Sequence, residues 1–159
     1  MEDVASHPDL TSPELNAVMR EILDQTEGGL GLAVADITSA RLLGVAHNIP
    51  YFNQGYLDAV AAGAVSMFRG AEVQHIEGLL TDLSGVVHRK TIDEVQMTTH
   101  RTIHFMMVLP NHRNSVVVLI TDRRTSLGMA WSMVRGSSLR IEPVLESLGI
   151  DPADDANPQ

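Results

Sequence analysis

Histidines are the residues of this chain best suited to proton transfer or metal binding, and two of them have a suggestive spacing. His100 and His104 are four residues apart, which suits a metal ion bound on one face of a helix. Here they lie in sequence with β-strand patterning, without the Glu of a metalloprotease helix, although on a strand both would still face the same side. The sequence therefore predicts no metal site. Four other histidines are interpreted as surface or strand-end residues: His47, His75, His88 and His112.

Nucleophilic and acid–base chemistry find equally little support. The chain has no cysteine, and no serine stands in a Gly-x-Ser-x-Gly setting. Asp93 and Glu94 are paired carboxylates, but adjacent residues on a strand point to opposite faces and cannot form a catalytic dyad. A small hydrolase or isomerase using His100, His104 and Asp122 remains a weak alternative. We expect a protein that is not an enzyme.

A glycine cluster at residues 28–31 invites comparison with nucleotide-binding loops. Gly28, Gly29 and Gly31 precede an extended run instead of following one, and Val34 stands where a third motif glycine would be. No Gly-Lys-Ser/Thr occurs anywhere in the chain. The cluster predicts a helix-to-strand turn and no cofactor.

Three charged residues, Asp122, Arg123 and Arg124, lie between a buried strand and the last helix, where small domains often place recognition groups. Arg123 and Arg124 are therefore candidate partner-docking residues. The alternative is a solvated loop in which Asp122 stabilises the start of the helix.

Composition sets the class of the protein. With 159 residues, 44% hydrophobic and 19% charged, the chain fits one globular domain, expected at residues 12–150 between a flexible arm (1–11) and a disordered tail (151–159). No apolar run approaches the ~20 residues of a membrane span, and the N-terminus has no signal-peptide pattern. Since there are also no cysteines, we expect a cytoplasmic protein without membrane insertion.

The formal net charge of −9 weighs against nucleic-acid binding, which usually needs a basic surface. The charge is uneven, because residues 89–140 hold eight basic and only three acidic residues. This stretch is either a docking face for an acidic partner or a set of arginines that solvate strand edges and loops.

The elements that position these residues can be read from hydrophobic spacing and turn signals. A capped helix is expected over Pro13–Gln25, and a last helix begins at Thr125 or Ser126 with a kink or break near 140–142, before Pro143. Five strands are expected: Leu30–Ile37, Leu42–His47, Glu94–Thr99, Arg101–Leu109 and Ser115–Thr121. The pattern predicts an α+β domain, a five-stranded antiparallel sheet with helices on both faces that buries all patterned apolar residues.

The segment between Phe52 and Phe68 carries one charge, Asp58, in seventeen residues. A helix that is apolar nearly all round must be covered on two sides. The sheet can cover one side and a second subunit the other, with small residues allowing two helices to approach closely. A homodimer is therefore expected, with this set at the interface: Ala59, Gly63, Ser66 and Met67.

A short amphipathic helix is expected next. After Arg69 and Gly70, apolar residues follow at helical spacing: Val73, Ile76, Leu80 and Leu83.

The order helix, hairpin, helix, short helix, three-strand meander, helix resembles the roadblock family of dynein light chains and its bacterial relatives, a roadblock/profilin-like fold. The likeness runs from about Leu15 to Leu148. It rests on residues 31–36 as first strand, the alanine-rich helix at 59–68, the strand at 115–121 and Ser126 to Ala130 after it. The chain departs from relatives at residues 38–41, where they often show Asp-Gly, and in a longer segment at 71–91.

The resemblance implies a homodimer in which central helices pair and third strands join two sheets into one, which adds Val95 and Met97 to the expected interface. It also implies a scaffold or regulatory role, often beside a small Ras-like GTPase whose GTP hydrolysis some bacterial members stimulate.

A ligand-sensing domain of the PAS or GAF type is the main alternative. It would need a cavity, which Met106, Met107 and Trp131 could line, although ordinary core packing also explains them.

Overall fold

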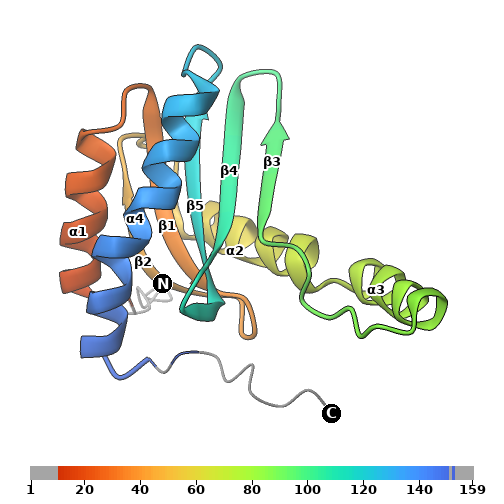
Figure 1. Cartoon of the computed structure of the whole chain (residues 1–159). Coiled ribbons are helices and arrows are strands. Elements are labelled where there is room, and N and C mark those ends of the chain that lie inside the picture. The colour runs from red at the N-terminus through yellow and green to blue at the C-terminus, as the bar shows by residue number, and fades with distance from the viewer. Residues whose placement is uncertain (1–10, 151, 153–159) are drawn as a thin grey trace, which may run out of the picture.

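The computed structural model describes residues 11–150 and residue 152, and its centre is one antiparallel sheet with the strand order β2-β1-β5-β4-β3 (Figure 1). The strands are β1 (Gly29–Asp36), β2 (Arg41–His47), β3 (Glu94–Thr98), β4 (Thr102–Leu109) and β5 (His112–Asp122). The helices are α1 (Pro13–Asp24), α2 (Gln54–Arg69), α3 (Ala71–Ser84) and α4 (Leu127–Ser147). The expected α+β class and five-stranded antiparallel sheet are confirmed. The expected arm and tail lie, apart from Thr11 and Pro152, outside the described residues.

The middle strand β5 is buried on both faces, as its β-branched run predicts. Successive residues of β5 point to opposite sides, so Val117 and Leu119 join one hydrophobic cluster and Val116, Val118 and Ile120 join another. The sheet therefore separates two cores.

Helices α1 and α4 cover the first core (Figure 1). Helix α1 starts where Ser12 Oγ accepts a hydrogen bond from the Leu15 backbone N–H at 3.2 Å, and it buries Leu15, Met19, Ile22 and Leu23. Ser126 caps α4 in the same way, as one of the two predicted caps.

A kink or break was expected near residues 140–142, and the break is wrong, since α4 runs without interruption from Leu127 to Ser147. Pro143 is exposed and cannot donate to the helical ladder. The residues on either side of it, Ile141 and Leu145, are fully buried against the sheet. Their packing holds the last turns in helical conformation at the cost of one hydrogen bond.

Helix α2 covers the second core. It begins at the cap Asn53 and buries Leu57, Ala61, Ala64 and Phe68 against the sheet. Its opposite side faces away from the sheet. No helix in the described part of the chain is long and apolar enough to cross a bilayer.

Helix α3 departs from the expectation that the fold buries every patterned apolar residue. It contacts α2 but projects beyond the β3 side of the sheet (Figure 1), and Ile76, Leu80 and Leu83 are exposed. That expectation is wrong because α3 buries Glu77 and leaves these apolar residues outside.

Two turns can be compared with the prediction. Gly28 has φ +75° in the turn from α1 to β1, where a side chain would also collide with Thr125, so the glycine cluster is the predicted helix-to-strand turn. The turn between β4 and β5 is shorter than the predicted 110–114, because β5 begins at His112.

Candidate interaction surfaces

The outer side of α2 is a smooth, nearly uncharged surface. Ala59, Ala62 and Ser66 are exposed, and a Cβ added at Gly63 would meet nothing within 4 Å. Met67 is half-buried at its margin. The helix's exposed acid, Asp58, accepts a hydrogen bond from Gln54 at 2.7 Å near the N-terminal end of α2. The surface can accept another helix at short distance but offers no group for chemistry.

Strand β3 lies at the edge of the sheet next to β4. Val95 and Met97 are half-buried and point to the same side of the sheet as α2. All six residues of the expected interface are thus on one side of the molecule, and each is at least partly exposed in a single chain.

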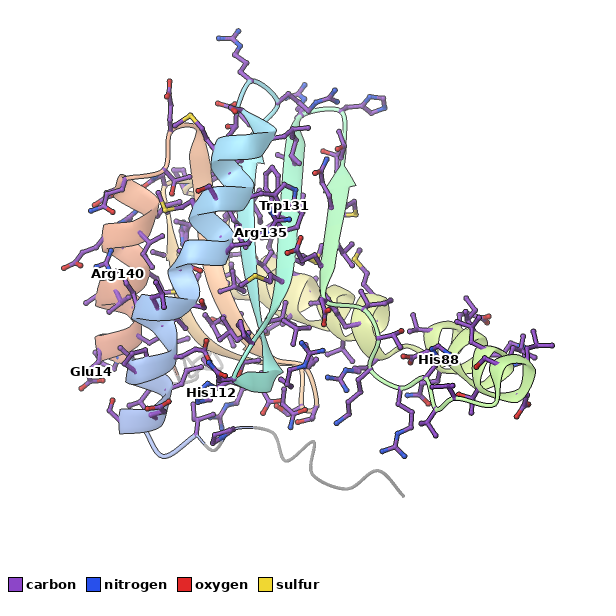
Figure 2. All side chains as sticks on the ribbon, viewed as in Figure 1. Glu14, His88, His112, Trp131, Arg135 and Arg140 are labelled. Atoms are coloured by element: carbon purple, nitrogen blue, oxygen red, sulfur yellow. The ribbon has the colours of Figure 1, made fainter. Side chains whose placement is uncertain are left out.

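The opposite side of β3 is tied to α4. The Arg135 guanidinium donates two hydrogen bonds to the Glu94 carboxylate at 2.8 and 2.7 Å, and Trp131 Nε1 donates to Gln96 Oε1 at 3.0 Å (Figure 2). The hydrogen bonds from Arg135 lower the pKa of Glu94. These contacts hold β3 in place, so its outer edge is a fixed surface and not a loose strand.

The two edges of the sheet are finished differently. On β2, side chains and backbone of the α1 region reach the outer edge: Asn16 Oδ1 accepts from Val45 N–H at 2.8 Å, Arg20 donates to His47 O at 3.2 Å, and Ser12 N–H donates to Leu43 O at 3.0 Å. On β3, within the described residues, no second strand pairs with the outer edge. An edge of this kind is a template for another strand.

The loop between β5 and α4 holds the predicted docking residues Arg123 and Arg124, both exposed. Arg123 donates to Thr99 O at 2.7 Å, while Asp122 Oδ1 accepts from the backbone N–H of Arg124 at 2.9 Å. Asp122 therefore organises the start of α4, as the solvated-loop interpretation expects. A hollow of about 340 Å³ lies beside this loop, lined by Arg124, Glu27 and Met129 among others.

The histidines do not form a site. His100 is exposed in the turn between β3 and β4, whereas His104 is buried inside β4 with Thr102 Oγ1 3.2 Å from its Nε2. The two histidines share no strand face, because β3 ends at Thr98 and β4 begins at Thr102, which leaves His100 outside both strands. Burial lowers the pKa of His104. No group of three His, Cys, Asp or Glu among the described residues is arranged to hold a metal ion.

One polar pair was missed by sequence reasoning. His112, interpreted as a surface or strand-end residue, does begin β5 but is only 1% exposed (Figure 2). Its Nδ1 lies 2.9 Å from Glu142 Oε2, which also accepts from the Asn111 backbone N–H at 3.0 Å. The two residues are thirty positions apart in the sequence, one at a hairpin turn and one on α4, so no local sequence pattern indicates that they pair. It fastens the turn to the helix.

The remaining candidate functional residues do not lie together. Met106 and Met107 are buried in different cores on opposite faces of the sheet, so with Trp131 they cannot line one cavity as a sensor domain would require. Asp93 and Glu94 bind different arginines, Arg113 and Arg135, consistent with their opposite orientation.

Comparison with known proteins shows the fold. No protein-family model matches the sequence, and no match to a curated protein is found. Among solved structures, gliding protein MglB from Thermus thermophilus is 18% identical with a TM-score of 0.65, covering 88% of this chain and 98% of that one. An MglB described with a tetrameric arrangement is 16% identical with a TM-score of 0.64, covering 88% and 97%.

A Roadblock/LC7 domain from Streptomyces avermitilis is 11% identical with a TM-score of 0.61, covering 82% of this chain and 97% of that chain. These likenesses extend over nearly the whole of each neighbour. At such low identity they establish the architecture and leave function to the surfaces described above.

Proposed function

We propose that this chain, which has a roadblock-type α+β fold, is a non-enzymatic homodimeric regulatory or scaffold module of the cytoplasm that binds a small Ras-like GTPase. The observation that carries the proposal is the uncovered side of the molecule, where the outer side of α2 and the edge strand β3 lie together. Neither surface carries a cluster of residues suited to catalysis, and both surfaces are suited to binding another protein.

The outer side of α2 supports pairing of two α2 helices. Stable homodimer interfaces are poor in charge at their centre, and the exposed residues from Ala59 to Met67 include none. Since Gly63 has open space above it, a second helix can approach there without displacing any atom of this chain.

The edge of β3 supports the pairing of two sheets. A two-fold axis beside β3 would place it antiparallel to its own copy, since a two-fold interface brings the same patch together from both subunits. Val95 and Met97 would then lose their remaining exposure beside the paired helices. The resulting ten strands would form one continuous sheet.

A GTPase partner is supported by the roadblock-type fold and by the exposed arginines of the β5–α4 loop. Arg123 is anchored to Thr99, and the β5–α4 loop that carries Arg123 and Arg124 lies at the end of the sheet away from α3 (Figure 1). Two arginines on a braced loop can recognise carboxylates or a phosphate of a partner. Their position would leave them free when two chains pair through β3.

The dimer is tested by replacing Gly63 with leucine and measuring mass in solution by sedimentation. Because Gly63→Leu wedges the helices apart, we expect dissociation, with a loss of about 1–3 kcal/mol or more of association free energy. Gly136→Leu is the matched control, since Gly136 is a helical glycine on α4 that also has nothing within 4 Å. A wild-type monomer, or an unchanged Gly63→Leu dimer, contradicts the proposed packing.

The partner is tested by capture of purified Ras-like GTPases from the same genome and by GTP hydrolysis rates with and without the protein. We expect one GTPase to bind and Arg123→Ala with Arg124→Ala to weaken it, while Arg41→Ala on β2 does not. Absence of both binding and any rate change across the set refutes the GTPase part and leaves the dimer standing.

A further inference from the structure

A hollow of about 530 Å³ is lined by helix α3 and by the segment at 85–91, which runs back along that helix (Figure 1). Two hydrogen bonds hold the segment in place. Thr81 Oγ1 accepts from the His88 backbone N–H at 2.9 Å, and Glu77 Oε2 accepts from the Thr91 backbone N–H at 2.7 Å. The two walls are therefore bonded to each other, and the volume lies in the range of small-molecule sites, about 300–1,000 Å³.

The wall formed by α3 lacks a side chain at Gly78, which lines the hollow. A glycine inside a helix is less favourable than an alanine. Among the described residues nothing forbids a side chain at this position, because a Cβ added to Gly78 would meet no atom within 4 Å. What the glycine contributes is open space on the inner side of the hollow.

Basic side chains reach the hollow from two elements. Arg69 comes from the C-terminal end of α2, and Arg89 and Lys90 come from the segment at 85–91. Two acids also line the hollow, but Glu77 is buried and already accepts two hydrogen bonds through Oε2, which leaves Asp82 as the exposed acid. The charge balance at the hollow is thus positive in a chain whose formal net charge is −9. An anion that the chain as a whole repels is attracted here.

Lys90 has a backbone conformation that favours glycine, with φ 52°. Arg113 donates a hydrogen bond to the Lys90 carbonyl at 3.3 Å, which helps to fix this conformation. Residues held in such conformations cost free energy and cluster at ligand-binding positions. Lysine at this place supplies what glycine lacks, an ammonium group at the hollow.

We propose that this hollow binds a small phosphorylated molecule, whose phosphate group is held by Arg69, Arg89 and Lys90. Arginine presents paired N–H donors that match phosphate oxygens, and lysine adds a compact charge. A phosphate monoester suits three cations better than a carboxylate does, because it carries nearly two negative charges and three acceptor oxygens at neutral pH. Gln74 and His88 offer polar groups to the rest of the molecule (Figure 2).

Pyrophosphate is the probe for this site, titrated into the full chain at low salt and followed by calorimetry. We expect a dissociation constant below about 1 mM. Lys90→Gly should raise that constant about tenfold or more, because a charged hydrogen-bond donor is lost. The same variant should unfold at an unchanged or higher urea concentration, since glycine suits the φ of this position. Arg41→Ala, which removes an exposed cation from β2, is the control and should leave the dissociation constant unchanged.

A second variant closes the hollow and keeps its charges. Gly78→Leu places a side chain in the open space, so pyrophosphate binding should be lost while the far-ultraviolet spectrum shows no loss of helix. Gly136→Leu, at a helical glycine of α4 that also has nothing within 4 Å, should bind as the wild type does. A wild-type chain that does not bind pyrophosphate, or binding that survives either Lys90→Gly or Gly78→Leu, overturns the site. Neither outcome bears on the proposed dimer or on the GTPase, which are assigned to other residues.

Discussion

The two ends of the sheet have opposite designs. At the β2 end, α1 packs its apolar side against the sheet, and the α1 region bonds Leu43, Val45 and His47 along the strand's outer edge. At the β3 end, within the described residues, the edge meets no second strand, and the neighbouring helix α3 turns its apolar side outward. Both ends are built from an edge strand and an amphipathic helix. The difference teaches that an apolar pattern fixes which side of a helix needs cover but not which chain provides it.

The largest expected contrast is between matched leucine truncations at the two ends. Leu15→Ala empties a fully buried position beneath β2 and should cost about 2–5 kcal/mol of unfolding free energy at any protein concentration. Leu83→Ala should change the unfolding free energy little, because Leu83 is 84% exposed in the single chain. Urea denaturation of both variants measures the contrast. A Leu83→Ala loss as large as that of Leu15→Ala would remove the distinction.

The next prediction concerns the hydrogen bonds that cover the outer edge of β2. Asn16→Ala removes the acceptor of the Val45 backbone N–H and should cost about 1–3 kcal/mol, because that donor is left without its partner. Asn16→Asp keeps an oxygen at this place and should recover most of the loss. If alanine and aspartate were equally harmful, the side chain would act through packing and the edge would not depend on this bond.

The fold was predictable from sequence because its signals are local. Ser12, Pro13 and Glu14 announce α1, the run from Ser115 to Thr121 announces a strand buried on both faces, and these elements formed close to their expected bounds. Pro143 misled because burial of Ile141 and Leu145 outweighs the loss of one helical bond. His112 misled because its partner Glu142 lies far along the chain.

The candidate interface was predictable only as a list of residues. An all-round apolar α2 identifies the surface that needs cover, while the spacing of Ile76, Leu80 and Leu83 predicts a helix without saying where its face points. That direction is decided by Glu77 and Thr81, whose long-range bonds to residues 88–91 leave no cover for the apolar side.

Lowering the pH should destabilise the β3 end of the sheet. Met97 is the cross-strand neighbour of His104, whose pKa burial lowers below the unfolded value near 6.5. The unfolded chain therefore binds the proton first as the pH falls. Stability from this group is complete above about pH 6.5 and is lost as the pH falls toward the folded pKa, at up to about 1.4 kcal/mol per pH unit.

If β3 pairs with a second copy, burial of His104 increases, and the slope should be steeper in the dimer than in the Gly63→Leu monomer. His104→Gln should flatten both slopes between pH 6.5 and 5. Thermal unfolding of the four proteins across that range measures the effect. Equal slopes in dimer and monomer would place His104 and Met97 away from the interface.

The smallest contrast concerns two exposed ion pairs, Glu94 with Arg135 beside β3 and Glu21 with Arg140 between α1 and α4. Each contributes little to the stability of the folded chain, because solvent screens both partners. Glu94→Gln and Glu21→Gln should therefore differ little in unfolding free energy at low concentration. Only Glu94→Gln loosens one of the contacts that tie the edge strand to α4, so only it should weaken dimerisation, measured by sedimentation in low and high salt. If Glu21→Gln weakened the dimer equally, the pairing surface would not be confined to the β3 end of the sheet, and the proposed difference between the two ends would fail.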